Sequence, residues 1–219
     1  MTPEISVIKL EYAGHGMRHR EPFYGSFNEL AEDMYRLILQ DLTRGGIFRQ
    51  RIEPYALMGY SMGSISAVEV LRQVVAHGEL PTPEHVFLAA HEPASHTVLA
   101  DWNESDNDDA VKKRTIQFGG VPERLINNKS FWRVYLPIYK SDYRMIKNYD
   151  FPQLNVDQLV PVTVFYSEQD TPYSRIRGWD KHFSGECDYI CYDGPHFFIQ
   201  KHYEEMAKDI KRRLLDWTR

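Results

Sequence analysis

Apolar and polar residues follow one another along the chain in a pattern that predicts strands and helices in turn. Short apolar runs with the length and composition of β-strands occur at residues 5–10, 55–58, 85–90, 160–166 and 189–192. Apolar residues at helical spacing predict amphipathic helices at residues 27–40, 64–76 and 203–217. Strands that alternate with helices favour an α/β fold, a largely parallel sheet with helices on both faces.

The section from about residue 91 to residue 158 is less regular. It contains short helical patterns around residues 111–118, 122–127 and 131–148 and lies between two predicted strands. We expect a helical lid inserted over the carboxyl edge of the sheet, where ligands bind in such folds. A length of 219 residues fits one domain, so we expect residues 1–219 to form a single unit that includes this lid.

The start of the first predicted helix offers two capping residues. Ser26 or Asn28 could accept a hydrogen bond from the first turn.

Composition and charge exclude several classes of function. The net charge is −5, and no basic patch is interleaved with aromatic residues, so we expect no nucleic-acid partner. No apolar run could span a bilayer, and the first residues lack the pattern of a signal peptide, so we expect a cytoplasmic protein without a membrane partner. Cys187 and Cys191, four apart in a strand-like segment, are expected to be reduced. We expect no metal and no cofactor, because neither a metal-ligand spacing nor a glycine-rich nucleotide loop occurs.

The segment Gly59-Tyr60-Ser61-Met62-Gly63 lies between a predicted strand and a predicted helix. This is the context of a nucleophile elbow, in which a sharp turn projects the serine hydroxyl above the sheet. We therefore predict Ser61 as the nucleophile and the backbone N–H of Met62 as a donor to an oxyanion. Side chains at positions 59 and 63 are expected to collide with the neighbouring strand and helix. The alternative is an ordinary strand-to-helix turn.

A serine nucleophile needs a base, and the base needs an acid. In this fold the chain order is serine, acid, histidine. Asp170 follows the strand at 160–166, and His196 lies on the loop after the last strand, so we predict them as acid and base. Glu168 and Glu92 are alternative acids. His91 and His202 are the other histidines near the sheet edge.

Five elements of the sequence together resemble a known family, the type II thioesterases of nonribosomal peptide and polyketide synthesis. They run in order along nearly the whole chain and are residues 12–18, 59–63, 118–122, 136–143 and 193–198. The resemblance implies the α/β-hydrolase fold and Ser61, Asp170 and His196 as a catalytic triad. It also implies hydrolysis of acyl groups from the phosphopantetheine arm of an acyl or peptidyl carrier protein.

The chain departs from the family pattern in two places. Tyr60 stands where the family usually has histidine. Family members also begin with a strand ending in Phe-Pro-x-Ala-Gly-Gly, which supplies the second oxyanion donor, whereas this chain starts at the strand that follows. Losing one such donor costs about 3–4 kcal/mol of transition-state stabilisation in a serine protease. The resemblance thus leads us to expect a weak hydrolase.

Two other functions remain open: a generic carboxylesterase with the same triad, and a truncated, non-catalytic relative that only binds the carrier protein. If the protein is a thioesterase or a non-catalytic relative of one, we expect the lid to dock the carrier protein through basic side chains. These are Lys112, Lys113, Arg114, Lys140 and Arg144. The alternative is that these charges form a solvated face.

Overall fold

A computed structural model describes residues 5–43, 53–93, 106–149, 160–185 and 187–216. Within these residues four parallel strands form one sheet in the order β1-β2-β3-β4. The strands are β1 (Ala56–Tyr60), β2 (His85–Ala89), β3 (Val162–Tyr166) and β4 (Cys187–Cys191). The predicted α/β fold with a parallel sheet is therefore confirmed.

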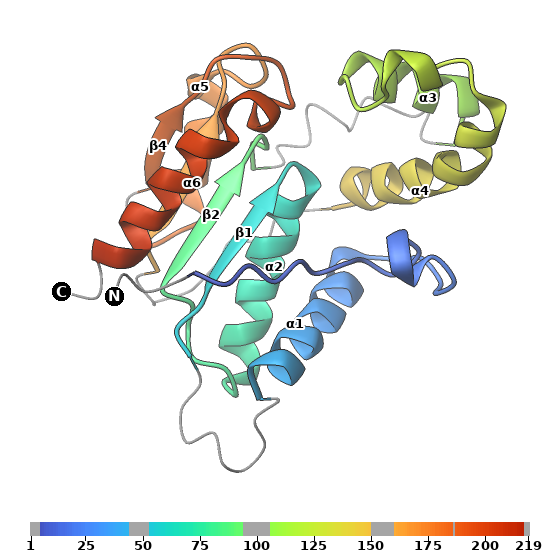
Figure 1. Cartoon of the computed structure of the whole chain (residues 1–219). Helices are drawn as coiled ribbons and strands as arrows, with labels where there is room; N and C mark the ends of the chain where they lie inside the picture. The colour runs from blue at the N-terminus through green and yellow to red at the C-terminus, as the bar shows by residue number, and fades with distance from the viewer. Residues whose placement is uncertain (1–4, 44–52, 94–105, 150–159, 186, 217–219) are drawn as a thin grey trace.

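Helices cover both faces of this sheet. The α-helices are α1 (Phe27–Thr43), α2 (Met62–His77), α3 (Asp108–Gln117), α4 (Lys129–Lys147), α5 (Tyr173–Ile176) and α6 (Ile199–Asp216). Short 3-10 helices are η1 (Gly16–Arg18), η3 (Glu123–Leu125) and η4 (Arg177–Lys181). In Figure 1, α1 and α2 lie on one side of the sheet, α6 lies on the other, and α3 and α4 form a separate layer. None of the described helices is long and apolar enough to cross a membrane.

The alternation along the central strands separates two cores. In β2, Val86 and Leu88 belong to the core beneath α1 and α2, whereas Phe87 and Ala89 belong to the core beneath α6. All four are at most 1% exposed, as expected for a parallel strand covered on both faces. The ring of Phe87 stacks on that of Phe165 in β3, with 6.1 Å between the centroids.

Capping residues fix the ends of α1 and α2. The Ser26 hydroxyl accepts a hydrogen bond from the Glu29 N–H at 3.2 Å, whereas the Asn28 side chain accepts one from Gln73. Ser26 is therefore the cap of α1. Gly78 ends α2 at a φ of 68°, and its N–H donates to the carbonyl of Val74.

The prediction of a strand at residues 5–10 is wrong. The structure gives these residues no strand, and Val7 is 87% exposed. A strand needs a neighbour for its backbone hydrogen bonds, and this segment has none among the described residues. The loop that follows is organised by Arg18, which pairs with Glu21 and Asp33 and donates to the carbonyl of Glu11.

Of the predicted lid, the structure describes residues 91–93, which are not helical, and residues 106–149, which are mostly helical. Its helices α3 and α4 are capped by Asn107 and Asn128, whose side chains accept backbone N–H groups. They pack around a small core of their own, made of Val111, Val121, Trp132 and Leu136. Residues 94–105 and 150–158 of the predicted lid lie outside the described residues.

The two cysteines both lie in β4. Cys187 is buried, Cys191 is exposed, and both are free thiols.

A partly buried ionic contact joins the lid to the loop before α1. His15 Nε2 lies 3.2 Å from Asp142 Oδ2 on α4, and His15 Nδ1 lies 3.0 Å from the carbonyl oxygen of Ala13. Both partners can only accept, so an imidazolium with two N–H groups satisfies both. Burial, which alone would lower the pKa of His15, is outweighed by Asp142, and the pKa is raised. Burial raises the pKa of Asp142 despite His15, so the ionised carboxylate is only partly compensated.

We predict that His15→Gln destabilises the protein more at low pH than at high pH. A glutamine can still donate to Asp142 but carries no charge. Because the folded-state pKa of His15 is raised, its charge stabilises the fold below its unfolded pKa of about 6.5, and this is lost as pH rises through the folded value. The variant should melt about 2–4 °C lower at about pH 6, with a smaller deficit at about pH 8. A deficit that is constant with pH would show that His15 acts only by packing.

Candidate active site

Ser61 occupies the turn between β1 and α2 in a strained conformation. Its φ is 52° and its ψ is −124°, outside the regions that non-glycine residues favour. Its N–H donates to the carbonyl of Ala89 at the end of β2, at 2.8 Å. A Cβ atom added at Gly59 would lie 1.9 Å from the carbonyl oxygen of Gly63, so this position has no room for a side chain. The turn thus has the geometry of a nucleophile elbow.

The prediction that a side chain at position 63 would collide with the neighbouring strand and helix is wrong. A Cβ atom there would meet only the Tyr12 hydroxyl, at an ordinary contact distance of 3.8 Å. A buried side chain on the next residue instead holds the turn. Ser64 Oγ lies 3.0 Å from the carbonyl oxygen of Gly59 and 2.9 Å from that of Ala89, and accepts the Ala89 N–H. Ser64 therefore joins both sides of the turn to β2.

The structure brings Ser61, His196 and Asp170 into one chain of hydrogen bonds. His196 Nε2 lies 2.9 Å from Ser61 Oγ, and His196 Nδ1 lies 3.0 Å from Asp170 Oδ1. The carboxylate only accepts, so Nδ1 carries the proton and Nε2 accepts the serine hydroxyl. The side chains of His196 and Asp170 are only 12% and 9% exposed. This arrangement can deprotonate the serine and hold the resulting imidazolium.

The two alternative acids have other partners. Glu92 forms an ion pair with Arg175, and burial raises the pKa of its carboxyl. The Glu168 carboxylate accepts the N–H of Tyr173 at the start of α5. Asp170 is thus the carboxylate that contacts His196.

The two alternative histidines also lie apart from the serine hydroxyl. His91 is partly buried, its Nδ1 contacts the carbonyl oxygen of Glu92, and burial lowers its pKa to about 4, which keeps the imidazole neutral. His202 lies in α6, where it pairs with Asp193 at 2.8 Å and stacks on Tyr192.

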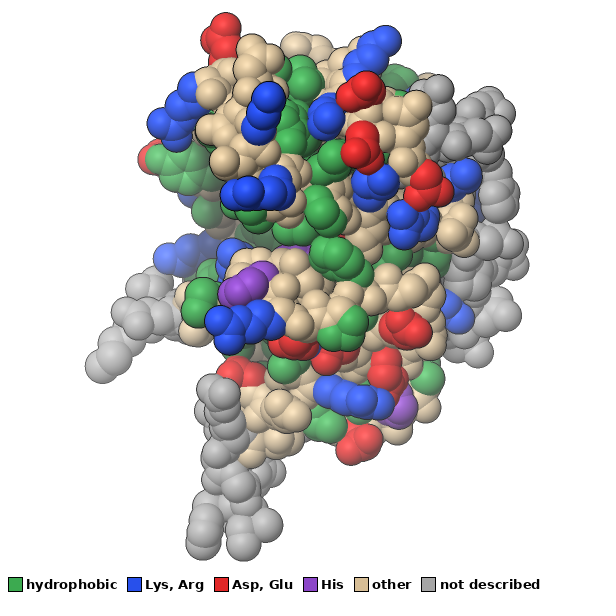
Figure 2. Space-filling view, turned by 90° about the vertical axis from the view of Figure 1, so that its right-hand side faces the viewer, with side chains coloured by type: hydrophobic (Ala, Val, Ile, Leu, Met, Phe, Trp, Pro, Cys, Tyr) green, Lys and Arg blue, Asp and Glu red, His purple; other side chains and the backbone are tan. Residues whose placement is uncertain are grey.

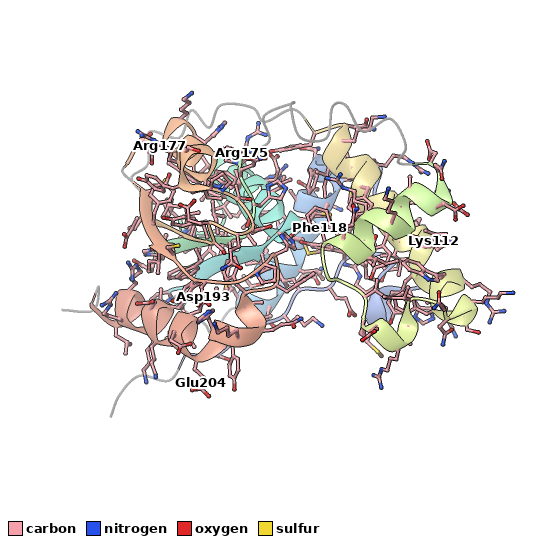
Figure 3. The ribbon with its side chains drawn as sticks, turned by 90° about the horizontal axis from the view of Figure 1, so that it is seen from above. Lys112, Phe118, Arg175, Arg177, Asp193 and Glu204 are labelled. Carbon is pink, nitrogen blue, oxygen red and sulfur yellow. The ribbon has the colours of Figure 1, made fainter. Side chains whose placement is uncertain are left out.

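Aromatic side chains surround His196. Phe118, at the end of α3, lies with its ring centroid 5.0 Å from that of the imidazole, and Phe197 lies at the same distance, edge to face. Figure 3 shows Phe118 on the side of the lid nearer the sheet, with Lys112 farther out. The lid therefore touches the histidine that contacts Ser61.

Met62 is the first residue of α2, so its N–H has no acceptor within the helix and points from the helix's positive end. In the loop before α1, the N–H groups of Ala13, Gly14 and His15 are occupied by Tyr24, Arg18 and Tyr12 respectively. Of these four N–H groups, that of Met62 is the one that the geometry offers to an oxyanion.

Basic side chains on the lid largely have partners within the lid. Lys140 pairs with Asp108 and Arg144 with Asp106, each at 2.7 Å. Lys112 pairs with Asp109, and Arg114 lies over the rings of Phe118 and Tyr143. Figure 2 shows acidic and basic groups interspersed on this face. The predicted basic docking surface is thus mostly neutralised by neighbouring aspartates.

A hollow of about 550 Å³ lies between α4, the start of α3 and the loop before α1. Its lining includes Phe23, Trp132, Leu136 and Arg133, and none of the residues in the Ser61–His196–Asp170 chain. It is therefore separate from the candidate chemistry.

The sequence analysis missed two residues at the site, Tyr60 and Phe118. Both belong to motifs that carried the family resemblance, but their contacts with His196 span large sequence distances.

The described residues contain no group of three or more histidine, cysteine, aspartate or glutamate side chains that could hold a metal ion.

Comparisons with known proteins give the family. A model of the thioesterase domain family matches residues 1–214. The medium-chain S-acyl fatty acid synthase thioesterase of Rattus norvegicus is 26% identical over 90% of this chain and 72% of its own length. Thioesterase PikA5 of Streptomyces venezuelae is 24% identical over 97% of this chain and 73% of its own.

Among solved structures, ClbQ from the colibactin nonribosomal peptide and polyketide synthase pathway has a TM-score of 0.79. It is 25% identical, and the match covers 94% of this chain and 83% of ClbQ. The family model spans nearly the whole chain, and the solved relatives share its α/β-hydrolase fold. The chain therefore belongs to the thioesterase domain family.

Proposed function

We propose that this protein is a type II thioesterase that hydrolyses acyl groups from the phosphopantetheine arms of carrier proteins. The observation that carries the proposal is the hydrogen-bonded chain Ser61–His196–Asp170 at a strained elbow, in a chain of the thioesterase family. Relatives such as ClbQ, which belong to nonribosomal peptide and polyketide pathways, support the choice of substrate class.

In this proposal Ser61 attacks the thioester carbonyl while His196 takes the hydroxyl proton. Asp170 stabilises the imidazolium, and the Met62 N–H donates to the oxyanion. The C–S bond breaks, and the proton on His196 goes to the departing thiol. Water, deprotonated by His196, then attacks the acyl-serine. The bond between the acyl carbon and Ser61 Oγ breaks, His196 returns its proton to Oγ, and the carboxylic acid leaves.

The two other functions have less support. A generic carboxylesterase would use the same three residues, and no observation on this chain favours it. A non-catalytic carrier-binding relative would have no need of a strained serine with an aligned histidine and carboxylate, because such strain persists only where the surrounding structure enforces it.

We predict that Ser61→Ala abolishes hydrolysis of an acyl-pantetheine thioester, with kcat falling about 10⁴-fold or more. The variant should also lose the single label left by a fluorophosphonate probe. Ser174→Ala, at an exposed position on α5, is the control and should behave as the parent. Labelling that survives Ser61→Ala would place the nucleophile elsewhere.

We predict that Asp170→Asn lowers kcat by about 10²- to 10⁴-fold, because an amide cannot stabilise the imidazolium. Glu92→Gln should leave kcat near the parent value and lower the melting temperature, since Arg175 loses its charged partner. If the Glu92 change damages kcat and the Asp170 change does not, the acid has been misassigned.

We further propose that the lid face formed by α3 and α4 docks the carrier protein. Because Lys140 and Arg144 are engaged by aspartates, attraction for an acidic partner should come from other exposed cations. Lys113 on α3 and Arg133 on α4 are both exposed, and Arg133 lines the hollow beside α4. Charges at the edge of a protein–protein interface mainly change the rate at which the two partners associate.

We predict that the double change Lys113→Glu and Arg133→Glu raises KM for an acyl-carrier protein about threefold to tenfold. KM for a small acyl-pantetheine should not change. Lys211→Glu, at an exposed position on α6, is the matched control for charge reversal away from the lid. Equal effects on the large and small substrates would reject docking at this face.

A further inference from the structure

Tyr60 connects the elbow to the loop that carries His196. It is the last residue of β1, directly before Ser61. Its hydroxyl lies 2.5 Å from the main-chain carbonyl oxygen of His196, across 136 positions of sequence. A carbonyl can only accept, so the tyrosine hydroxyl donates. One side chain thus joins the strand leading to the serine with the backbone of the histidine.

The surroundings of Tyr60 fix its ring as well as its hydroxyl. The ring lies 5.5 Å from that of Phe198 and stacks parallel to that of Phe197 at 6.5 Å. It meets the His196 imidazole edge to face at 6.1 Å. Burial raises the pKa of Tyr60, so the phenol remains a neutral donor throughout the working range of a hydrolase.

The His196 loop is held from a second direction by Ser167. Its hydroxyl, just after β3, donates to the carbonyl of Gly194, a glycine with a φ of 123°. Ser167 therefore fixes the entry to the loop, while Tyr60 fixes the histidine's own peptide group. The two contacts leave little freedom for the backbone that carries the imidazole.

We propose that Tyr60 is a positioning residue, whose hydroxyl holds the His196 backbone so that Nε2 stays in hydrogen-bond reach of Ser61 Oγ. The inference rests on the proposed function and adds a role for a residue at which this chain departs from the usual family pattern. Its effect is on the reaction step, because Tyr60 acts through His196 and not through the acyl group. Small misplacements of a reacting group cost up to about 10²-fold in rate.

Tyr60→Phe tests this by removing one hydroxyl and keeping the ring. The matched control is Tyr55→Phe: the Tyr55 hydroxyl also donates to a main-chain carbonyl, that of Pro81 at 2.7 Å, next to the opposite end of β1. Tyr55→Phe loses this one hydrogen bond, whereas Tyr60→Phe also loses a long one, in which the hydroxyl accepts the Ile199 N–H at 3.5 Å. Both variants should melt at most about 2–4 °C below the parent. On an acyl-pantetheine, Tyr60→Phe should lower kcat about tenfold to a hundredfold with KM unchanged, and Tyr55→Phe should do neither.

A readout independent of turnover separates this inference from the proposed function. The proton between His196 Nδ1 and Asp170 can be followed by NMR, and it should exchange with water faster in Tyr60→Phe than in the parent or in Tyr55→Phe. If the parent fails to hydrolyse thioesters, the proposed function fails, and the exchange rate alone decides the role of Tyr60. Equal exchange and equal kcat in the two variants, or a loss confined to KM or melting temperature, would overturn the inference.

Discussion

The site depends on one backbone constraint, the strained positive-φ conformation of Ser61. A non-glycine residue held there costs about 1–3 kcal/mol, which the neighbouring structure must offset. The offset comes from β2, through the Ala89 carbonyl that accepts the Ser61 N–H and through the Ser64 hydroxyl between the two strands. The register that pairs Tyr60 with Ala89 is therefore what keeps the serine hydroxyl above the sheet.

Parallel strands then bring the other two groups to the same edge. Asp170 follows β3 and His196 follows β4, so the carboxyl ends of neighbouring strands supply the acid and the base. The lid meets this edge through Phe118, which packs on the imidazole, and it is joined to the loop before α1 through Asp142. The contact of Phe118 makes the lid part of the wall around His196.

Sequence patterns that span only a few residues were enough to predict most of the strands and helices and the order of the candidate catalytic residues. The buried strands, the helix after Ser61 and the chain order of serine, acid and histidine follow from periodicity and motif, and the structure brings the three side chains together. The strand at residues 5–10 could not be judged in this way, since alternation shows only that a segment could pair. The sequence also could not predict the contact of Tyr60 with His196 or the ion pair of Arg144 with Asp106, because each joins distant parts of the chain.

The choice between the two buried carboxylates follows from the partner of each. Glu92 faces a guanidinium that remains charged at every working pH, so its charge is already neutralised. Asp170 faces an imidazole, whose charge changes when it takes a proton, and its other oxygen has no partner among the described residues. His91 lies close by, but burial keeps it neutral, so it does not compete for the negative charge of Asp170. The carboxylate that can respond to a proton on His196 is therefore Asp170, and the Glu92–Arg175 pair gives the site a fixed and neutral neighbour.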